Sequence, residues 1–239
     1  MNSLWITTWL LAGVFVSALP TEDRKLEDTQ NDVCRPWKSD KVMFLEGHIT
    51  KYAMKENAIR NDLPAVSVCM IANWFSRGSE DEKCVFSYAT QEEPHELILC
   101  LRPYFRVLIR NETRNSLKGI PGDGSFHHLC FTWSSDNGDY KFWMDGKVVG
   151  DGSGFQKGTS IRHGGSAVVG QVQNSLGGDF EASKSWFGTV SGLNVFDEVR
   201  SDTDIINEAQ TCTVGQGDVI SWPQLYIEES LHGEVCVLP

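Results

Sequence analysis

The chain has 239 residues, a net charge of -11 and seven cysteines. This length is sufficient for one large domain with a substantial hydrophobic core. The acidic balance argues against binding to nucleic acid or to anionic membranes, because both are polyanions. An acidic surface is compatible with cation binding but does not establish it.

The N-terminus predicts a secretory signal peptide over residues 1–18. An apolar stretch from Leu4 to Val16 leads into a small-residue cleavage pattern, Val16-Ser17-Ala18. An uncleaved anchor is the less favoured alternative, because this stretch is short for a membrane span. Residues 19–38 are polar and are interpreted as a leader or linker before a domain over 39–239. No later segment predicts a membrane span, so we expect a secreted, extracellular protein.

Short segments rich in β-branched and aromatic residues follow one another from Val42 onward, as expected for strands. They are predicted at 65–75, 83–90, 96–101, 104–110, 166–172 and 186–196.

Residues 125–150 carry the clearest strand signal. Two apolar runs flank Asn137-Gly138, a strong short-range hairpin signal, and Asp145-Gly146 predicts a second turn. In the first run, the odd-numbered residues from Leu129 to Trp133 point to one face. The even-numbered residues from His128 to Thr132 point to the other face.

One short helix is predicted in the C-terminal half. Ser201 followed by Asp204 resembles a capping box with Asp in place of Glu. Ile205, Ile206 and Ala209 then form an apolar helical face. Many short strands with one short helix predict an all-β fold, a two-sheet sandwich.

Enzymatic motifs are absent from the sequence, with no G-x-S-x-G, HExxH or phosphate-binding loop. A sandwich-fold glycosidase is the least favoured alternative, because it needs two carboxylates facing each other across a cleft. Glu92 and Glu93 would diverge on a strand. Asp179 and Glu181 lie in a Gly-rich loop suited to metal ligation or solvation.

The pair His127-His128 is interpreted as the start of a strand, with one ring packed and one exposed. We therefore do not expect an enzyme.

Asn111-Glu112-Thr113 is an N-glycosylation sequon directly after a predicted strand. An unmodified turn asparagine is the alternative. In a secreted chain we expect Asn111 to carry a glycan.

The segment HLCFTWSS, residues 128–135, matches the signature His-x-Cys-x-Ser/Thr-Trp-x-Ser/Thr of the pentraxin family at every fixed position. VFSYAT (85–90), FWMDGK (142–147) and GQVQNSLGGDFE (170–181) occur in the pentraxin order and spacing. The resemblance covers the chain from about Val42 onward. It implies a jelly roll of two antiparallel sheets with one helix. It also implies a cyclic homo-oligomer, usually a pentamer, with ligands bound on one face through calcium.

The resemblance also implies a disulfide framework. It pairs Cys69 with Cys130, a closure that contributes roughly 4 kcal/mol in the chain-entropy model. Cys212 with Cys236 is the second predicted pair. Cys84 and Cys100 flank a predicted hairpin and are a candidate third pair. Cys34 then remains as a free thiol or an interchain bond. No cysteine pair or Cys/His cluster has zinc spacing.

The candidate calcium loop is GQVQNSLGGDFEASK, residues 170–184. The pentraxin pattern at this place is Gly-Gln-Glu-Gln-Asp-x-x-Gly-Gly-x-Phe-Glu/Asp-x-x-Gln. Val172 replaces the Glu that bridges both ions, Asn174 replaces the Asp, and Lys184 replaces the last Gln. Gln173, a backbone-carbonyl ligand in the family, is retained, as is Glu181.

The first calcium loop departs from the pattern as well, because Pro94-His95 stands where the family has an Asp-Asn pair. Calcium takes six to eight oxygen ligands, and carboxylates dominate. Lys184 places a positive charge where the second ion would lie, which is unfavourable by several kcal/mol at about 4 Å and an effective dielectric near 20. We therefore expect the two-calcium site to be lost.

Two alternatives stay open for the loop. One weak ion on Asn174, Glu181 and the Gln173 carbonyl, with help from Glu93 or Asp179, is the first. A turn that binds no metal is the second.

The resemblance implies a lectin-like pattern-recognition protein of innate immunity. It would bind phosphorylated, carbohydrate or other extracellular ligands with avidity from several copies. The alternative is a structural or adhesive extracellular pentraxin that has lost calcium binding.

Overall fold

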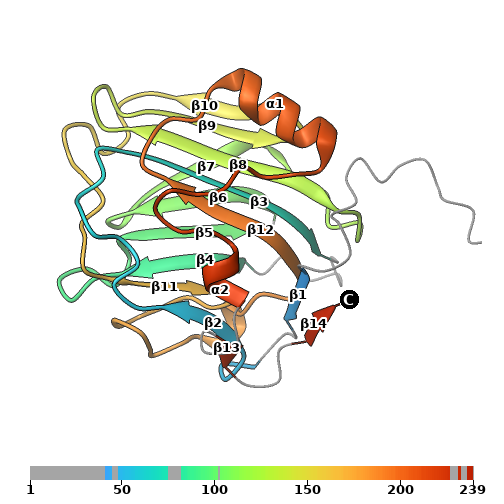
Figure 1. Ribbon diagram of the computed structural model, residues 1–239. Helices are drawn as coiled ribbons and strands as arrows, with labels where there is room; N and C mark the ends of the chain where they lie inside the picture. Colours follow the sequence, from blue (N-terminus) through green and yellow to red (C-terminus); the bar gives the residue numbers. More distant parts are fainter. Residues whose placement is uncertain are drawn as a thin grey trace, which may run out of the picture.

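The computed structural model describes residues 41–44, 48–74, 82–101, 103–226, 231–232 and 236–238. The predicted signal peptide, the leader and Cys34 lie outside these residues. The described strands form two antiparallel sheets that pack face to face (Figure 1). We call them the helix-side sheet and the loop-side sheet.

The helix-side sheet contains seven described strands. In spatial order they are β10 (Lys147–Gly152), β9 (Asp139–Met144), β8 (His127–Ser134), β3 (Ala65–Trp74), β12 (Gly188–Phe196), β1 (Lys41–Phe44) and β14 (Cys236–Leu238).

The loop-side sheet also contains seven described strands. In spatial order they are β13 (Leu231–His232), β2 (Tyr52–Lys55), β11 (Ser166–Val169), β4 (Lys83–Ala89), β5 (Leu97–Leu101), β6 (Tyr104–Ile109) and β7 (Glu112–Gly119). β7 was not predicted, because it is a polar edge strand with only one buried side chain. The predicted all-β, two-sheet jelly-roll sandwich is confirmed.

One hydrophobic core fills the space between the sheets. The predicted alternation in β8 holds, because Leu129, Phe131 and Trp133 are fully buried in this core. The aromatic rings of Phe105 and Phe142 meet across it, with centroids 5.1 Å apart. Each large apolar side chain buried in this way contributes about 1.5–3 kcal/mol.

The predicted turns shape the β8–β9–β10 region. Asp145 and Gly146 have φ angles of 50° and 72° and form the two-residue turn between β9 and β10. Positive φ at both positions is the mark of a type I′ hairpin turn. Gly138 also has a positive φ of 67°, and a Cβ there would lie 2.4 Å from the backbone nitrogen of Phe155. Position 138 therefore requires glycine.

The predicted helix is α1 (Asp202–Thr211), and it covers the outer face of the helix-side sheet (Figure 1). Ser201 caps it, because its hydroxyl accepts a hydrogen bond from the Asp204 backbone at 3.1 Å. Ile205 and Ala209 are buried, whereas Ile206 is 37% exposed. A short helix, α2 (Pro223–Tyr226), and a 3-10 turn, η1 (Ala182–Lys184), were not predicted.

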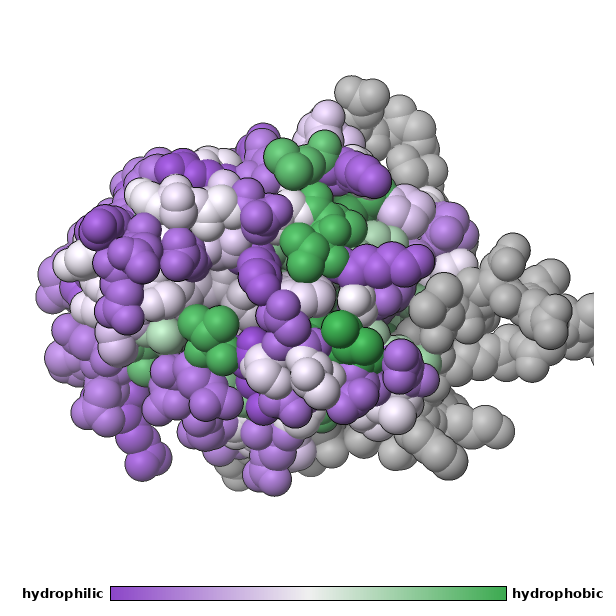
Figure 2. Space-filling model, turned by 90° about the horizontal axis from the view of Figure 1, so that it is seen from above, coloured by the Kyte–Doolittle hydropathy of each residue, from purple (hydrophilic) through white to green (hydrophobic). Residues whose placement is uncertain are grey.

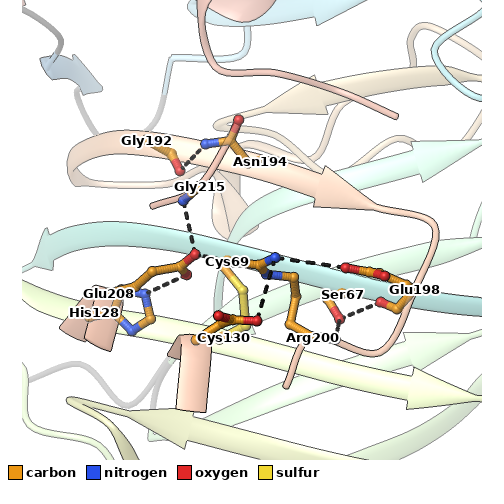
Figure 3. Close-up of a disulfide and its surroundings, with 11 residues drawn as sticks. Ser67, Cys69, His128, Cys130, Gly192, Asn194, Glu198, Arg200, Glu208 and Gly215 are labelled. Carbon is orange, nitrogen blue, oxygen red and sulfur yellow. Dashed lines mark hydrogen bonds and ion pairs between the residues drawn. A yellow bond between two sulfur atoms is a disulfide. The ribbon is translucent and has the colours of Figure 1, made fainter. Parts of the chain in front are cut away.

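The expectation that one ring of His127-His128 is exposed is wrong. His127 is 6% exposed and His128 is fully buried. His128 lies on the outer face of the sheet, where α1 and Glu208 cover it (Figure 3). The sequence pattern of one strand does not reveal that a helix far along the chain shields its outer face.

Two disulfides link neighbouring strands directly. Cys69–Cys130 joins β3 to β8 beneath α1 (Figure 3), and Cys84–Cys100 joins β4 to β5. Cys212 is also disulfide-bonded. Its predicted partner, Cys236, has a side chain outside the described part of the structure, so that pairing stays a prediction.

The surface is mostly hydrophilic at the end that carries α1, β9 and β10, where hydrophobic side chains gather in a few small patches (Figure 2). Exposed hydrophobic residues include Leu117, Val148, Val199 and Ile206. None of the described helices is long and apolar enough to cross a membrane.

Candidate functional site

The candidate site lies where three segments of the loop-side sheet meet. They are the turn between β4 and β5, the turn between β6 and β7, and the loop after β11. The side chains concerned, which we call the loop site, are Glu93, His95, Asn111, Asn174, Glu181 and Lys184. Five of them were predicted from the sequence to lie at the calcium loops, and the structure adds Asn111.

The turn that carries Asn111 is a tight hairpin. Arg110 and Asn111 have φ angles of 47° and 66° and form the two-residue connection between β6 and β7. Asparagine tolerates this left-handed conformation better than most residues. The backbone N–H of Arg110 donates to the His95 carbonyl at 3.0 Å, which ties this turn to the first loop.

The His95 ring lies between two side-chain amides. Its Nδ1 is 3.2 Å from the Asn111 Oδ1, and its Nε2 is 3.2 Å from the Asn174 Oδ1. The other atom of each amide fixes the amide's orientation. The Asn111 Nδ2 donates to Glu93 at 3.1 Å, and the Asn174 Nδ2 donates to the Asp179 carbonyl at 3.0 Å. Both amide oxygens therefore face the ring, which in its charged form donates to both.

The Glu181 carboxylate is engaged by its own loop. The Ser183 hydroxyl donates to Oε1 at 2.6 Å, and the Lys184 ammonium is 3.1 Å from Oε2. These hydrogen bonds, that of Ser183 first, hold the pKa of Glu181 below its usual range. The charges of Lys184 and His95 act in the same direction.

Gln173 supports the loop from beneath with a fully buried side chain. Its amide nitrogen donates to the carbonyls of Ser87 and Ser166 at 3.1 and 3.0 Å, and its amide oxygen accepts from the Gly177 backbone at 2.8 Å. These bonds hold the loop against β4 and β11. Because both polar atoms of the Gln173 side chain bond within the protein, this residue positions the loop.

Val172 lies in an apolar cluster beside the loop. It is 3% exposed and packs with Ile98, Leu108 and the cysteines of the Cys84–Cys100 bond. The position that carries a carboxylate in the pentraxin pattern is therefore part of a small hydrophobic patch on the outer face of the loop-side sheet. The sequence indicated the lost carboxylate but not this cluster.

A buried ion cluster supports the first loop. Glu96 is fully buried and bonds to the Arg110 guanidinium at 3.0 Å and to that of Arg162 at 2.8 Å. It also accepts from the Arg162 backbone at 2.8 Å. Because Arg110 precedes Asn111 and Glu96 follows His95, the cluster fixes two sides of the loop site. The sequence gives no signal of this role, because Glu96 looks like any polar residue at the start of a strand.

A groove of about 590 Å³ adjoins the loop. Its walls are formed by Ile49, Thr50, Tyr52, Gly177, Gly178, Asp179 and Phe180. The Tyr52 and Phe180 rings meet edge to face, with centroids 4.6 Å apart. Asp179 was predicted from the sequence as a helper ligand, and in the structure it lies in the wall of this groove.

The loop site does not fit the calcium pair that the pentraxin pattern implies. Calcium prefers six to eight oxygen ligands with several carboxylates. The Glu181 carboxylate is paired with an ammonium, Glu93 accepts from the His95 backbone and from Asn111, and Asn174 offers a neutral oxygen. The His95 ring occupies the space between the two loops.

Comparison with known proteins agrees with the fold. The Pentaxin family model matches residues 41–239. Neuronal pentraxin-2 of Mus musculus is 31% identical over 166 residues, which are 69% of this chain and 39% of that protein. Human pentraxin-4 is 32% identical over 157 residues, which are 62% of this chain and 31% of that protein. The chain thus matches well under half the length of these relatives.

Among solved structures, a heptameric SAP-like pentraxin from Limulus polyphemus superimposes with a TM-score of 0.71. The match covers 84% of this chain and 95% of that chain. At 24% identity it supports the fold alone. The family model spans every described residue, and the chain therefore belongs to the pentraxin family.

Proposed function

We propose that the chain is a secreted, multimeric pentraxin-type binding protein whose recognition does not depend on calcium. The observation that carries this proposal is the Lys184 ammonium 3.1 Å from the Glu181 carboxylate. Glu181 is the acidic ligand that the loop retains, and its carboxylate is paired with the ammonium group of Lys184. The pentraxin family consists generally of binding proteins, and we assign no catalytic step to this chain.

Charge balance supports the loss of calcium. An ion at Glu181 would have to displace Lys184 or lie beside it, and like charges at about 4 Å repel by several kcal/mol at an effective dielectric near 20. Val172 supplies no compensating carboxylate, because it is buried in an apolar cluster. The alternative of one weak ion on Asn174, Glu181 and the Gln173 carbonyl is therefore the less favoured one.

The groove beside the loop supports recognition by direct contact. It combines the Tyr52 and Phe180 rings with the Asp179 carboxylate and two glycines. Ligand sites combine apolar and aromatic walls with a few placed polar groups. A carbohydrate with one apolar and one hydroxyl face fits this chemistry, and a multimer would raise its weak affinity through avidity.

Exposed apolar side chains at one edge of the sandwich support the formation of a multimer. Leu117 on β7 is 76% exposed and Val148 on β10 is 44% exposed. The two strands are neighbours, because a Cβ on Gly150 would lie 3.0 Å from the Leu117 nitrogen. The Limulus relative is a heptamer, which supports a cyclic assembly of this chain without fixing its number of protomers.

Secretion is supported by the disulfides. Such bonds persist in oxidising compartments and are rare in the cytosol. Cys69–Cys130 and Cys84–Cys100 lie within the sheets, and Cys212 is bonded as well.

Calorimetric titration of calcium into the chelator-treated secreted protein tests the proposal. We expect no binding heat up to millimolar calcium. The double variant Asn174→Asp, Lys184→Gln restores family ligand types at one exposed and one partly exposed position, and we expect it to gain binding. Calcium binding by the unmodified protein that is lost in Glu181→Ala would contradict the proposal and favour calcium-dependent recognition.

A parallel experiment addresses the ligand. The protein is passed over immobilised carbohydrate and phosphorylated matrices in chelator and then in calcium. Retention that is equal in both buffers agrees with the proposal. Retention only in calcium contradicts it. No retention in either buffer favours the structural or adhesive alternative.

A further inference from the structure

Asn111 belongs both to a glycosylation sequon and to the loop site. It is the acceptor residue of the sequon Asn111-Glu112-Thr113, and its side chain is part of the loop site. We propose that Asn111 carries an N-linked glycan whose first sugar covers the loop site. This inference rests on the proposed secretion of the chain, because the sugar is added in the secretory pathway.

The turn presents Asn111 for modification. Asn111 is exposed at the tip of the β6–β7 hairpin, and a sequon is modified where it stands on an accessible surface segment. The Glu96 cluster and the Arg110–His95 backbone bond hold this tip beside the first loop. The glycan attachment point is therefore fixed relative to the loop site.

The chemistry needs a lipid pyrophosphate-linked oligosaccharide as donor. The Asn111 Nδ2 forms a bond to C1 of the first N-acetylglucosamine, and the bond from C1 to the pyrophosphate oxygen breaks. The lipid pyrophosphate leaves with the electron pair, and the proton lost from Nδ2 passes to solvent. The amide keeps one N–H, which is sufficient for the hydrogen bond that Nδ2 donates to Glu93 at 3.1 Å.

The position of the sugar follows from the neighbours of Asn111. The Oδ1 of the same amide lies 3.2 Å from the His95 Nδ1, and the His95 Nε2 lies 3.2 Å from Asn174. A sugar ring bonded to Nδ2 is thus attached to the same amide group whose oxygen contacts the His95 ring. It would shield the face on which the pentraxin pattern places calcium, which leaves the groove beside Tyr52 and Phe180 as the approach for ligands.

The first test is the mass of the chain secreted from mammalian cells. We expect a glycan that peptide-N-glycosidase removes, with conversion of Asn111 to aspartate in the corresponding peptide. Thr113→Ala destroys the sequon but leaves the Asn111 side chain in place, and we expect it to lack the glycan. Thr113→Ser keeps the sequon and is the matched control. A secreted chain with unmodified Asn111 would overturn the inference without touching the calcium result.

The second test measures whether the sugar covers the site. His95 is labelled with diethyl pyrocarbonate, and its modification rate is followed by peptide mass spectrometry. We expect the rate to be several-fold lower in the glycosylated protein and in Thr113→Ser than in Thr113→Ala. If Thr113→Ala folds poorly, Thr113→Val, which keeps the shape of the threonine side chain and also lacks the sequon, provides the same comparison with the Asn111 amide intact. Equal rates with and without the glycan would show that the sugar points away, and the inference would fail.

Discussion

His127 lies buried between two carboxylates. Its Nδ1 is 2.8 Å from Asp145, and its Nε2 is 3.4 Å from Asp123. Burial by itself lowers the pKa of the ring, but the hydrogen bond and charge of Asp145, together with those of Asp123, outweigh burial and raise it. The charged ring therefore stabilises the folded state.

The sign of the pH dependence follows from this raised pKa. The stabilisation by His127 is fully present below the ordinary pKa of histidine and is lost as the pH rises through the raised value. We expect Asp123→Asn to lower the pKa of His127, because one charge is removed, as measured by NMR titration of the ring. Asp136→Asn, on the exposed β8–β9 turn, is the control and should leave it unchanged. An unshifted pKa in Asp123→Asn would contradict this assignment.

At the scale of one element, Glu208 holds α1 in place. The Glu208 carboxylate bonds to the Arg200 guanidinium, accepts a hydrogen bond from the Gly215 backbone at 3.0 Å and lies 3.8 Å from His128 (Figure 3). Glu208 is 8% exposed, and of its partners His128 is fully buried and the Arg200 side chain is 18% exposed. The residue connects the helix to the sheet beneath it and to the loop that follows.

We expect Glu208→Ala to lower the free energy of unfolding by about 3–5 kcal/mol, as for the loss of one partner of a buried ion pair. Urea denaturation measures this cost. Glu198→Ala is the matched control, because the Glu198 side chain is 61% exposed and lies 3.7 Å from the same arginine. It should change stability by about 0.5 kcal/mol or less. Equal costs for both variants would contradict the role of Glu208.

At the scale of the whole molecule, each sheet contains one described disulfide between adjacent strands. Cys69–Cys130 spans 61 residues and joins β3 to β8 in the helix-side sheet. Cys84–Cys100 spans 16 residues and joins β4 to β5 in the loop-side sheet. All four cysteines are buried, so the main difference between the two bonds is the length of chain they close.

In the chain-entropy model, the closure of Cys69–Cys130 is worth about 4 kcal/mol and that of Cys84–Cys100 about 3 kcal/mol. We therefore expect the double variant Cys69→Ala, Cys130→Ala to be less stable than Cys84→Ala, Cys100→Ala. Equilibrium unfolding in urea orders the two variants. The reverse order would show that packing around the sulfur atoms, and not loop closure, decides the stability.

The sequence alone determined the sandwich, the β8–β9–β10 turns, α1 and its cap. Each of these depends on periodicity, turn residues and capping, which act over a few neighbouring positions. The polar strand β7 was missed, because an edge strand with exposed side chains lacks that alternation. The sequence also identified Val172, Asn174 and Lys184 as departures from the pentraxin calcium-loop pattern.

Only the tertiary structure decided what fills the loop site. His95, Asn111 and Asn174 come from segments far apart in the chain, and their contacts depend on the register of β4, β5 and β6 and on the loop after β11. The same holds for the buried pair His127-His128, whose cover comes from Asp145 and α1. Side-chain neighbours across a sheet are set by register and layer packing, which no local pattern encodes.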